Sequence, residues 1–144
     1  MADGVSLGAI LLAEDNPADA GLIRLALREH GVAHTVLVMR DGEAAMSWLQ
    51  ERLEQRSELL PALILLDLNL PKHDGWDILR YIRSDDGLKN IPVVIVTSSD
   101  SPLDRATARE LCPTHYLRKP SSLDEFLAIG GVIKECISEP HKDM

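Results

Sequence analysis

The chain lacks the features that mark several large classes of protein. It has two cysteines, Cys112 and Cys136, in 144 residues, and they fit neither a metal-ligand spacing nor a disulfide framework. It has no block of lysine and arginine, since 15 basic residues are scattered among 23 acidic ones and the net charge is −8. Binding to nucleic acid needs a basic cluster. We therefore expect proteins, cations or small molecules as partners, and no nucleic acid.

Long apolar runs are also missing. No run approaches the length that crosses a membrane, and the N-terminus carries Asp3 and no basic residue before the short run from Ala9 to Ala13. This pattern argues against a secretory signal, so we expect a cytoplasmic protein without membrane contact. The length of 144 residues predicts a single domain over 1–144, with a core from about 7 to 137 and no output domain.

What the chain does contain is an alternation of short apolar runs with segments of helical period. The runs predict five strands: Ala9 to Ala13, Thr35 to Met39, Leu63 to Leu66, Pro92 to Val96 and Tyr116 to Arg118. A helix start signal follows each strand, in order Asn16-Pro17, Asp41, Asp74, Ser101-Pro102 and Ser122. Glu125 stands at capping-box spacing from Ser122, and the last helix is expected to end near Ile137.

This alternation predicts an α/β fold. Apolar strands that each lead into a helix are typical of a parallel sheet whose strands are buried on both faces by helices. We expect a doubly wound (βα)5 sheet with the strand order 2-1-3-4-5, in which the second strand is an edge.

Polar side chains gather where these strands end. The first strand is followed by Glu14 and Asp15, the third by Asp67, the fourth by Thr97, and the fifth by Lys119. In open parallel sheets ligands bind beyond the carboxyl ends of the strands. Each residue alone has an ordinary structural explanation, such as two acids at a helix start or a solvated lysine. Together they predict a site.

The residue types at this edge suit phosphoryl transfer. Three crowded carboxylates repel one another unless a cation lies among them, and Mg²⁺ prefers oxygen ligands. A carboxylate can act as a nucleophile and form an aspartyl phosphate. We assign Asp67 as nucleophile and as a metal ligand, with Glu14 and Asp15 also on the metal. Thr97 and Lys119 are assigned to the phosphoryl oxygens, whose charge they can neutralise.

Four motifs in order make the chain resemble the receiver domains of two-component response regulators. They are "AEDN" (Ala13 to Asn16), "LLDLNLPKHDG" (Leu65 to Gly75), "VTSS" (Val96 to Ser99) and "LRKP" (Leu117 to Pro120). The resemblance implies a flavodoxin-like fold and the same roles for the five residues above. It adds the backbone carbonyl of Asn69 as a metal ligand, Tyr116 as a switch residue alongside Thr97, and a cis peptide bond before Pro120.

Within this family the chain is most similar to small stand-alone regulators that pair with phytochrome-type histidine kinases. The segment "EDNPAD" (Glu14 to Asp19) and the lengthened stretch before the third strand carry this likeness. It implies a phosphoprotein that receives its phosphoryl group from a sensor histidine kinase, with Mg²⁺, and signals by protein contact or onward phosphotransfer. Such a protein is no enzyme beyond its own phosphorylation and dephosphorylation.

Three other functions compete with this one. A haloacid-dehalogenase-type phosphatase needs a second acid two residues after its nucleophile, and Asn69 cannot donate a proton. A flavodoxin-like carrier needs a phosphate loop after the first strand, where Glu14 and Asp15 would repel phosphate. A binding module that cannot be phosphorylated would be expected to lack at least one of the five residues, and all five are present.

The last helix predicts a contact with another molecule. Leu123, Phe126, Leu127, Gly130 and Ile133 form one apolar stripe, sufficient to cover the sheet. Ile129, Val132 and Cys136 form a second stripe that a monomer would expose to water. We expect a homodimer or another partner to cover it, the alternative being a helix that is unusually buried within its own domain. The kinase is expected at the first helix, around Pro17, Ala18, Asp19 and Leu22, and at the loop after Lys119.

Overall fold

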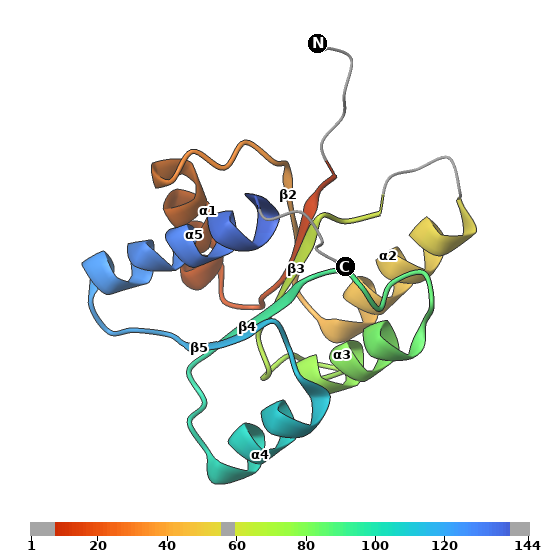
Figure 1. Ribbon diagram of the computed structural model, residues 1–144. Helices are drawn as coiled ribbons and strands as arrows, with labels where there is room; N and C mark the ends of the chain where they lie inside the picture. The colour runs from red at the N-terminus through yellow and green to blue at the C-terminus, as the bar shows by residue number, and fades with distance from the viewer. Residues whose placement is uncertain (1–7, 56–59, 139–144) are drawn as a thin grey trace.

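In the part of the chain that the structure describes, five strands form one parallel sheet with helices on both faces (Figure 1). The computed structural model describes residues 8–55 and 60–138. The elements are β1 (Ile10–Ala13), α1 (Pro17–Glu29), β2 (Val36–Met39), α2 (Gly42–Glu54), β3 (Leu63–Leu66), α3 (Gly75–Ser84), β4 (Val93–Thr97), α4 (Pro102–Leu111), β5 (His115–Arg118) and α5 (Leu123–Ser138). The order β2-β1-β3-β4-β5 confirms the predicted fold, and the predicted strands differ from the observed ones by at most one residue at either end.

The helices begin where side-chain oxygens can accept hydrogen bonds from the first turn. Asn16 Oδ1 accepts from the backbone N–H groups of Ala18 and Asp19 at 2.9 and 3.2 Å, and Pro17 occupies the first helical position. Asp41, Asp74, Ser101 and Ser122 accept in the same way, each from the residue three positions on. These caps satisfy backbone N–H donors that a helix start leaves without a partner. In α1 the cap at Asn16 lets the helix begin at Pro17, four residues after the end of β1.

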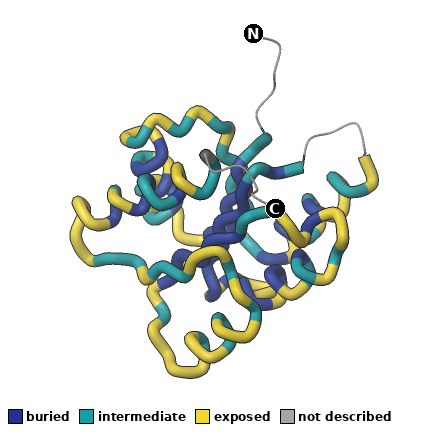
Figure 2. The backbone as a smooth tube through the Cα atoms, in the orientation of Figure 1, coloured by how far each residue is buried: buried dark blue, intermediate teal, exposed yellow. Residues whose placement is uncertain are grey.

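The core has two layers, one on each face of the sheet. α1 and α5 cover one face, and α2, α3 and α4 lie on the other (Figure 1). β1, β3 and β4 are completely buried, as their continuous apolar sequences predict (Figure 2). β2 and β5 are at most half-buried. The prediction that every strand is buried on both faces is therefore wrong for these two, because each is an edge strand with a neighbour on one side only.

The second apolar stripe of α5 is not the exposed surface that the sequence predicted. Ile129 is 6% exposed and packs with Phe126 and Ile133 into the core layer shared with α1, whereas Val132 and Cys136 are half-buried. α1 lies close enough to α5 to cover part of this stripe. At Ile129 the alternative prediction, a helix that is unusually buried within its own domain, is therefore correct. This removes the main reason to expect self-association through this stripe.

The close approach of α1 and α5 depends on a glycine. A Cβ at Gly130 would lie 2.3 Å from the Ala26 carbonyl oxygen and 2.5 Å from His30 Cδ2. Along the same seam, His30 Nε2 lies 3.1 Å from the Leu127 carbonyl oxygen. The two helices can therefore approach this closely only because residue 130 has no side chain.

Within the described residues, no helix is long and apolar enough to span a membrane.

We predict that Gly130→Ala lowers the free energy of unfolding by about 2 kcal/mol, because the added methyl group forces α1 and α5 apart. Urea denaturation measures this change. Gly21→Ala on α1 is the matched control: an added Cβ there meets nothing within 4 Å, and alanine should stabilise the helix by about 0.5–1 kcal/mol. Equal stability of Gly130→Ala and the parent would show that the two helices do not depend on this contact.

Candidate functional site

Four strands deliver the site residues to one edge of the sheet. Glu14 and Asp67 directly follow β1 and β3, Thr97 is the last residue of β4, and Lys119 directly follows β5. Backbone hydrogen bonds continue the sheet through these positions, from Asp67 N to Ala13 O at 3.0 Å and from Lys119 N to Thr97 O at 2.7 Å. The backbone of each residue is therefore held as firmly as the strand before it. The structure brings all the predicted strand-end residues to this edge.

Glu14, Asp15 and Asp67 converge. One carboxylate oxygen from each lies within 4.8 Å of the others. Glu14 and Asp67 are buried, and Asp15 is exposed, so the group opens to solvent on one side. Oxygen ligands from two buried carboxylates and an exposed one suit a hard divalent cation that keeps some of its water. These residues fit the magnesium site that the sequence predicts.

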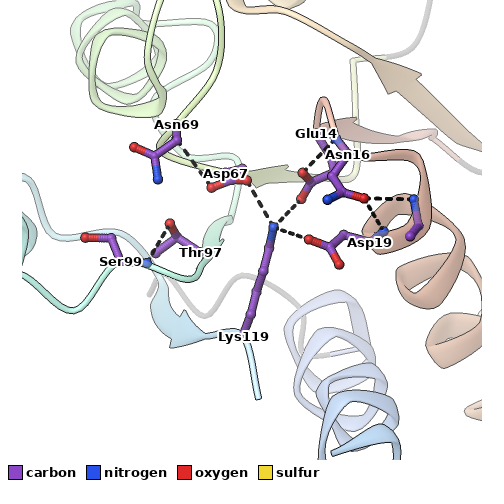
Figure 3. Close-up of polar contacts among 9 residues, drawn as sticks. Glu14, Asn16, Asp19, Asp67, Asn69, Thr97, Ser99 and Lys119 are labelled. Carbon is purple, nitrogen blue, oxygen red and sulfur yellow. Dashed lines mark hydrogen bonds and ion pairs between the residues drawn. The ribbon is translucent and has the colours of Figure 1, made fainter. Parts of the chain in front are cut away.

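Asn69 stands two residues after Asp67 and contacts it through the backbone. Its backbone N–H donates to Asp67 Oδ1 at 3.3 Å, and the backbone N–H of Asn16 donates similarly to Glu14 Oε2 at 3.2 Å (Figure 3). Both bonds orient carboxylates of the acidic group. The role of the Asn69 carbonyl as a metal ligand stays a prediction.

The Lys119 ammonium pairs with two members of this group, Glu14 and Asp67, and with Asp19. Its Nζ lies 2.9 Å from Glu14 Oε1, 3.0 Å from Asp67 Oδ2 and 2.7 Å from Asp19 Oδ2 (Figure 3). Burial lowers the pKa of Lys119, but the hydrogen bonds to Asp19 and Glu14 and the charge of Asp67 outweigh it and hold that pKa above its ordinary value. Lys119 is therefore a permanent cation at the site.

The charged form of Glu14 is costly at this position. Its side chain is 1% exposed, and burial, reinforced by the charge of Asp67, raises its pKa to about 7 against the opposing effect of Lys119. A carboxylate that is costly to ionise binds a divalent cation in competition with a proton. The site should therefore respond to pH near neutrality.

Thr97 and Tyr116 form a separate set of contacts beside the acidic group. Thr97 is fully buried, and its Oγ1 accepts from the backbone N–H of Ser99 at 3.2 Å. The Tyr116 hydroxyl donates to the Ser99 carbonyl oxygen at 3.1 Å, and its ring stacks on Trp76 with centroids 6.3 Å apart. The two predicted switch residues thus meet at the loop after β4, through Ser99.

Asp104, in the first turn of α4, ties this loop to α3. Trp76 Nε1 donates to Asp104 Oδ1 at 2.8 Å, and Ser99 Oγ donates to Asp104 Oδ2. The hydrogen bonds from Ser99 and Trp76 lower the pKa of Asp104. Sequence analysis did not single out Asp104 or the Asp19–Lys119 contact. Each acid stands three residues after a helix cap, which explains its position but does not indicate its partner.

One backbone prediction is wrong. The peptide bond between Lys119 and Pro120 is trans, and the described residues contain no cis peptide bond. A trans bond before proline is favoured by about 0.5–1 kcal/mol. The Lys119 side chain reaches Asp67 with this bond in its ordinary form.

Comparisons with known proteins agree with this geometry. The model of the response regulator receiver domain family matches residues 10–129. Response regulator Rcp1 from Synechocystis sp. is 42% identical over 124 residues, which are 85% of this chain and 84% of that protein. The crystal structure of the phosphorylated cyanobacterial phytochrome response regulator RcpA superposes with a TM-score of 0.80 at 41% identity, over 90% of this chain and 93% of that one.

A second solved structure bears on the metal. The Mn²⁺-bound form of Rcp1 superposes with a TM-score of 0.78 at 39% identity and covers 89% of this chain and 92% of that one. Receiver domains hold a divalent cation in an acidic pocket, and Glu14, Asp15 and Asp67 form such a pocket here. The similarity to phytochrome-associated regulators confirms the likeness predicted from "EDNPAD" and the neighbouring motifs.

We predict that Mg²⁺ affinity falls about tenfold between pH 8 and pH 6, because Glu14, with a pKa of about 7, must lose its proton before it can bind the metal. Isothermal titration at the two pH values measures the change. Glu14→Gln should bind Mg²⁺ more weakly at pH 8 and lose most of the pH dependence. A wild-type dissociation constant that is the same at both pH values would contradict the role of Glu14.

Proposed function

Because the chain belongs to the response regulator receiver domain family, we propose that Asp67 accepts a phosphoryl group from a sensor histidine kinase in a Mg²⁺-dependent reaction. One observation carries the proposal. The Asp67 carboxylate is buried, lies in one acidic group with Glu14 and Asp15, and pairs with the Lys119 ammonium at 3.0 Å. A nucleophilic carboxylate flanked by a cation site and a fixed cation is what transfer to an aspartate requires.

The chemistry follows from these positions. An Asp67 oxygen attacks phosphorus, the bond from phosphorus to the donor nitrogen breaks, and its electron pair stays on the donor imidazole. A metal ion held by Glu14, Asp15 and Asp67 would neutralise charge on the phosphoryl oxygens. Lys119 donates hydrogen bonds to the phosphoryl oxygens as well. The product is an aspartyl phosphate, which water later hydrolyses.

Thr97 links this reaction to the surface. In this structure its hydroxyl oxygen accepts from Ser99 N, and the O–H of the same group can donate to a phosphoryl oxygen. The Tyr116 hydroxyl is bonded to the carbonyl of the same Ser99. A change at Thr97 therefore changes the backbone that holds Tyr116. The output is a protein contact or onward phosphotransfer.

We expect that acetyl phosphate with Mg²⁺ labels the wild type and that Asp67→Asn is not labelled, because the amide cannot act as the nucleophile. Electrophoresis with a phosphate-binding gel measures the modified fraction. Asp15→Asn should label more slowly, since the metal site loses a ligand. Equal labelling of the wild type and Asp67→Asn would show that the phosphoryl group is carried elsewhere.

The donor is proposed to dock over a hollow beside Lys119. This hollow, of about 430 Å³, is lined by polar Asp19, Ser98 and Lys119 and by apolar residues of α1 and α5, among them Leu22, Leu123 and Phe126. Leu123 is 54% exposed although it is a large apolar residue. Apolar residues beside Lys119, which itself pairs with Asp67, suit a helical partner that must bring its histidine within reach of Asp67. The likeness to RcpA makes a phytochrome-type kinase the proposed partner.

We predict that Ala18→Arg, an exposed change at the start of α1, slows phosphotransfer from a phosphorylated phytochrome-type kinase about tenfold, because the larger side chain blocks the docking helix. Labelling by acetyl phosphate should be unchanged. Ala106→Arg is the matched control at an exposed position of α4 on the other face, and it should leave both rates intact. A loss with both donors would contradict a docking role for this surface.

Self-association through α5 stays a prediction. Its support is reduced to Val132 and Cys136, which are half-buried, because Ile129 is covered within the domain. Exposed Leu123 at the start of α5 favours a contact of this helix with the kinase.

A further inference from the structure

The Lys119 ammonium has a partner that the phosphorylation chemistry does not require. Asp19 comes from the first turn of α1, and its Oδ2 lies 2.7 Å from Lys119 Nζ, the shortest of the three ion pairs of that ammonium (Figure 3). The Lys119 side chain is 10% exposed and that of Asp19 24%. An ammonium has three N–H donors, so Asp19, Glu14 and Asp67 together can use all of them.

Two of these three partners belong to the acidic group that would hold the metal, and the third does not. Glu14 and Asp67 share the acidic group with Asp15, whereas Asp19 lies outside it. A carboxylate that binds a divalent cation gives up most of its attraction for a neighbouring ammonium, and the cation itself repels that ammonium. Phosphorylation also converts Asp67 into an acyl phosphate. Of the three carboxylates, Asp19 alone keeps its charge for Lys119 throughout the reaction.

We propose that Asp19 is a positioning residue that holds the Lys119 ammonium beside Asp67 once the metal and the phosphoryl group have taken its other two partners. Lysine has a flexible four-carbon side chain and loses much rotamer freedom when it is fixed. A fixed carboxylate on the first turn of α1 offsets that loss. Within the described residues, Asp19 forms no other ion pair, so its carboxylate is committed to this contact.

The position of Asp19 also explains why its negative charge does not repel the phosphoryl group strongly. The dashed contacts in Figure 3 place Lys119 Nζ between Asp19 and Asp67. The ammonium therefore screens the two groups from each other. In the phosphorylated state one N–H of Nζ would bond to Asp19 and the other two could bond to phosphoryl oxygens. Asp19 would therefore orient the ammonium and leave two of its three donors for the phosphoryl group.

This inference rests on the proposed phosphorylation of Asp67, and a double-mutant cycle tests it. Four proteins are compared: the wild type, Asp19→Asn, Lys119→Met and the double variant. Calorimetry measures two affinities for each, that of Mg²⁺ alone and that of beryllofluoride, a phosphoryl mimic, at saturating Mg²⁺. If Asp19 acts through Lys119, its effect must depend on the presence of Lys119.

We expect Asp19→Asn to weaken beryllofluoride binding about tenfold when Lys119 is present and less than twofold in the Lys119→Met background. Mg²⁺ affinity should change less than threefold, because Asp19 is not in the metal group. Unchanged or tighter beryllofluoride binding by Asp19→Asn would overturn the inference, as would an equal loss in both backgrounds. A matching loss of Mg²⁺ affinity would also overturn it, by showing that Asp19 acts on the metal.

Two controls separate positioning from a general effect on the fold. Asp77→Asn removes the acid at the equivalent place in the first turn of α3, where it pairs with Arg80, and should leave both affinities unchanged. Asp19→Glu keeps the charge and should keep beryllofluoride affinity within about threefold of the wild type. A wild type that binds no beryllofluoride would defeat the proposed function and this inference together, whereas a wild type that binds it while Asp19→Asn behaves normally would defeat this inference alone.

Discussion

The ion pairs of one largely covered ammonium hold the site together. Lys119 Nζ lies within 3.0 Å of carboxylates that directly follow β1 and β3 and of one on α1, at widely separated positions in the chain. Without it, the buried Glu14 would take up a proton more readily, because burial and the charge of Asp67 already raise its pKa to about 7. The carboxylates still exceed the cations, and this excess makes a place for a divalent ion.

The fold serves this arrangement by fixing backbones. β1, β3 and β4 are fully buried, so a shift in register would draw charged or polar strand-end residues into the core. The sheet hydrogen bonds also continue to Asp67 and Lys119. α1 matters as much as the strands, because its cap at Asn16 sets where Asp19 stands. The glycine contact between α1 and α5 in turn holds α1 against the domain. α1 therefore contributes both to the stability of the domain, through its contact with α5, and to the site, through Asp19.

Sequence reasoning recovered the fold and the strand-end residues because both follow from local patterns. Apolar runs and capping residues determine where strands and helices start, and parallel strands bring their carboxyl ends to one edge. The Asp19–Lys119 pair could not be found this way, because it joins residues 100 positions apart through side-chain geometry. Asp104 was missed for the same reason, since its partners Trp76 and Ser99 come from other elements.

Two errors have physical causes of a different kind. The apolar pattern of α5 indicates two faces but does not say how closely α1 approaches, and Gly130 allows an approach that buries Ile129. The cis bond before Pro120 was carried over from the family, and no property of the Lys-Pro pair itself predicts it. Roles that depend on a bound group, such as metal binding by the Asn69 carbonyl and donation by the Thr97 hydroxyl, remain proposals because they concern another state of the protein.

The central claim is that Asp67 carries the phosphoryl group and that the acidic group supplies the metal for it. Borohydride reduces an aspartyl phosphate to homoserine, which is stable. Borohydride treatment of the protein after its reaction with acetyl phosphate, followed by peptide mass spectrometry, therefore locates the modified residue directly. The account predicts one reduced residue, at Asp67, in the presence of Mg²⁺ and none when the metal is chelated. Reduction at Asp15 or Glu14, or modification of Asp67 that is as extensive without metal, would contradict it.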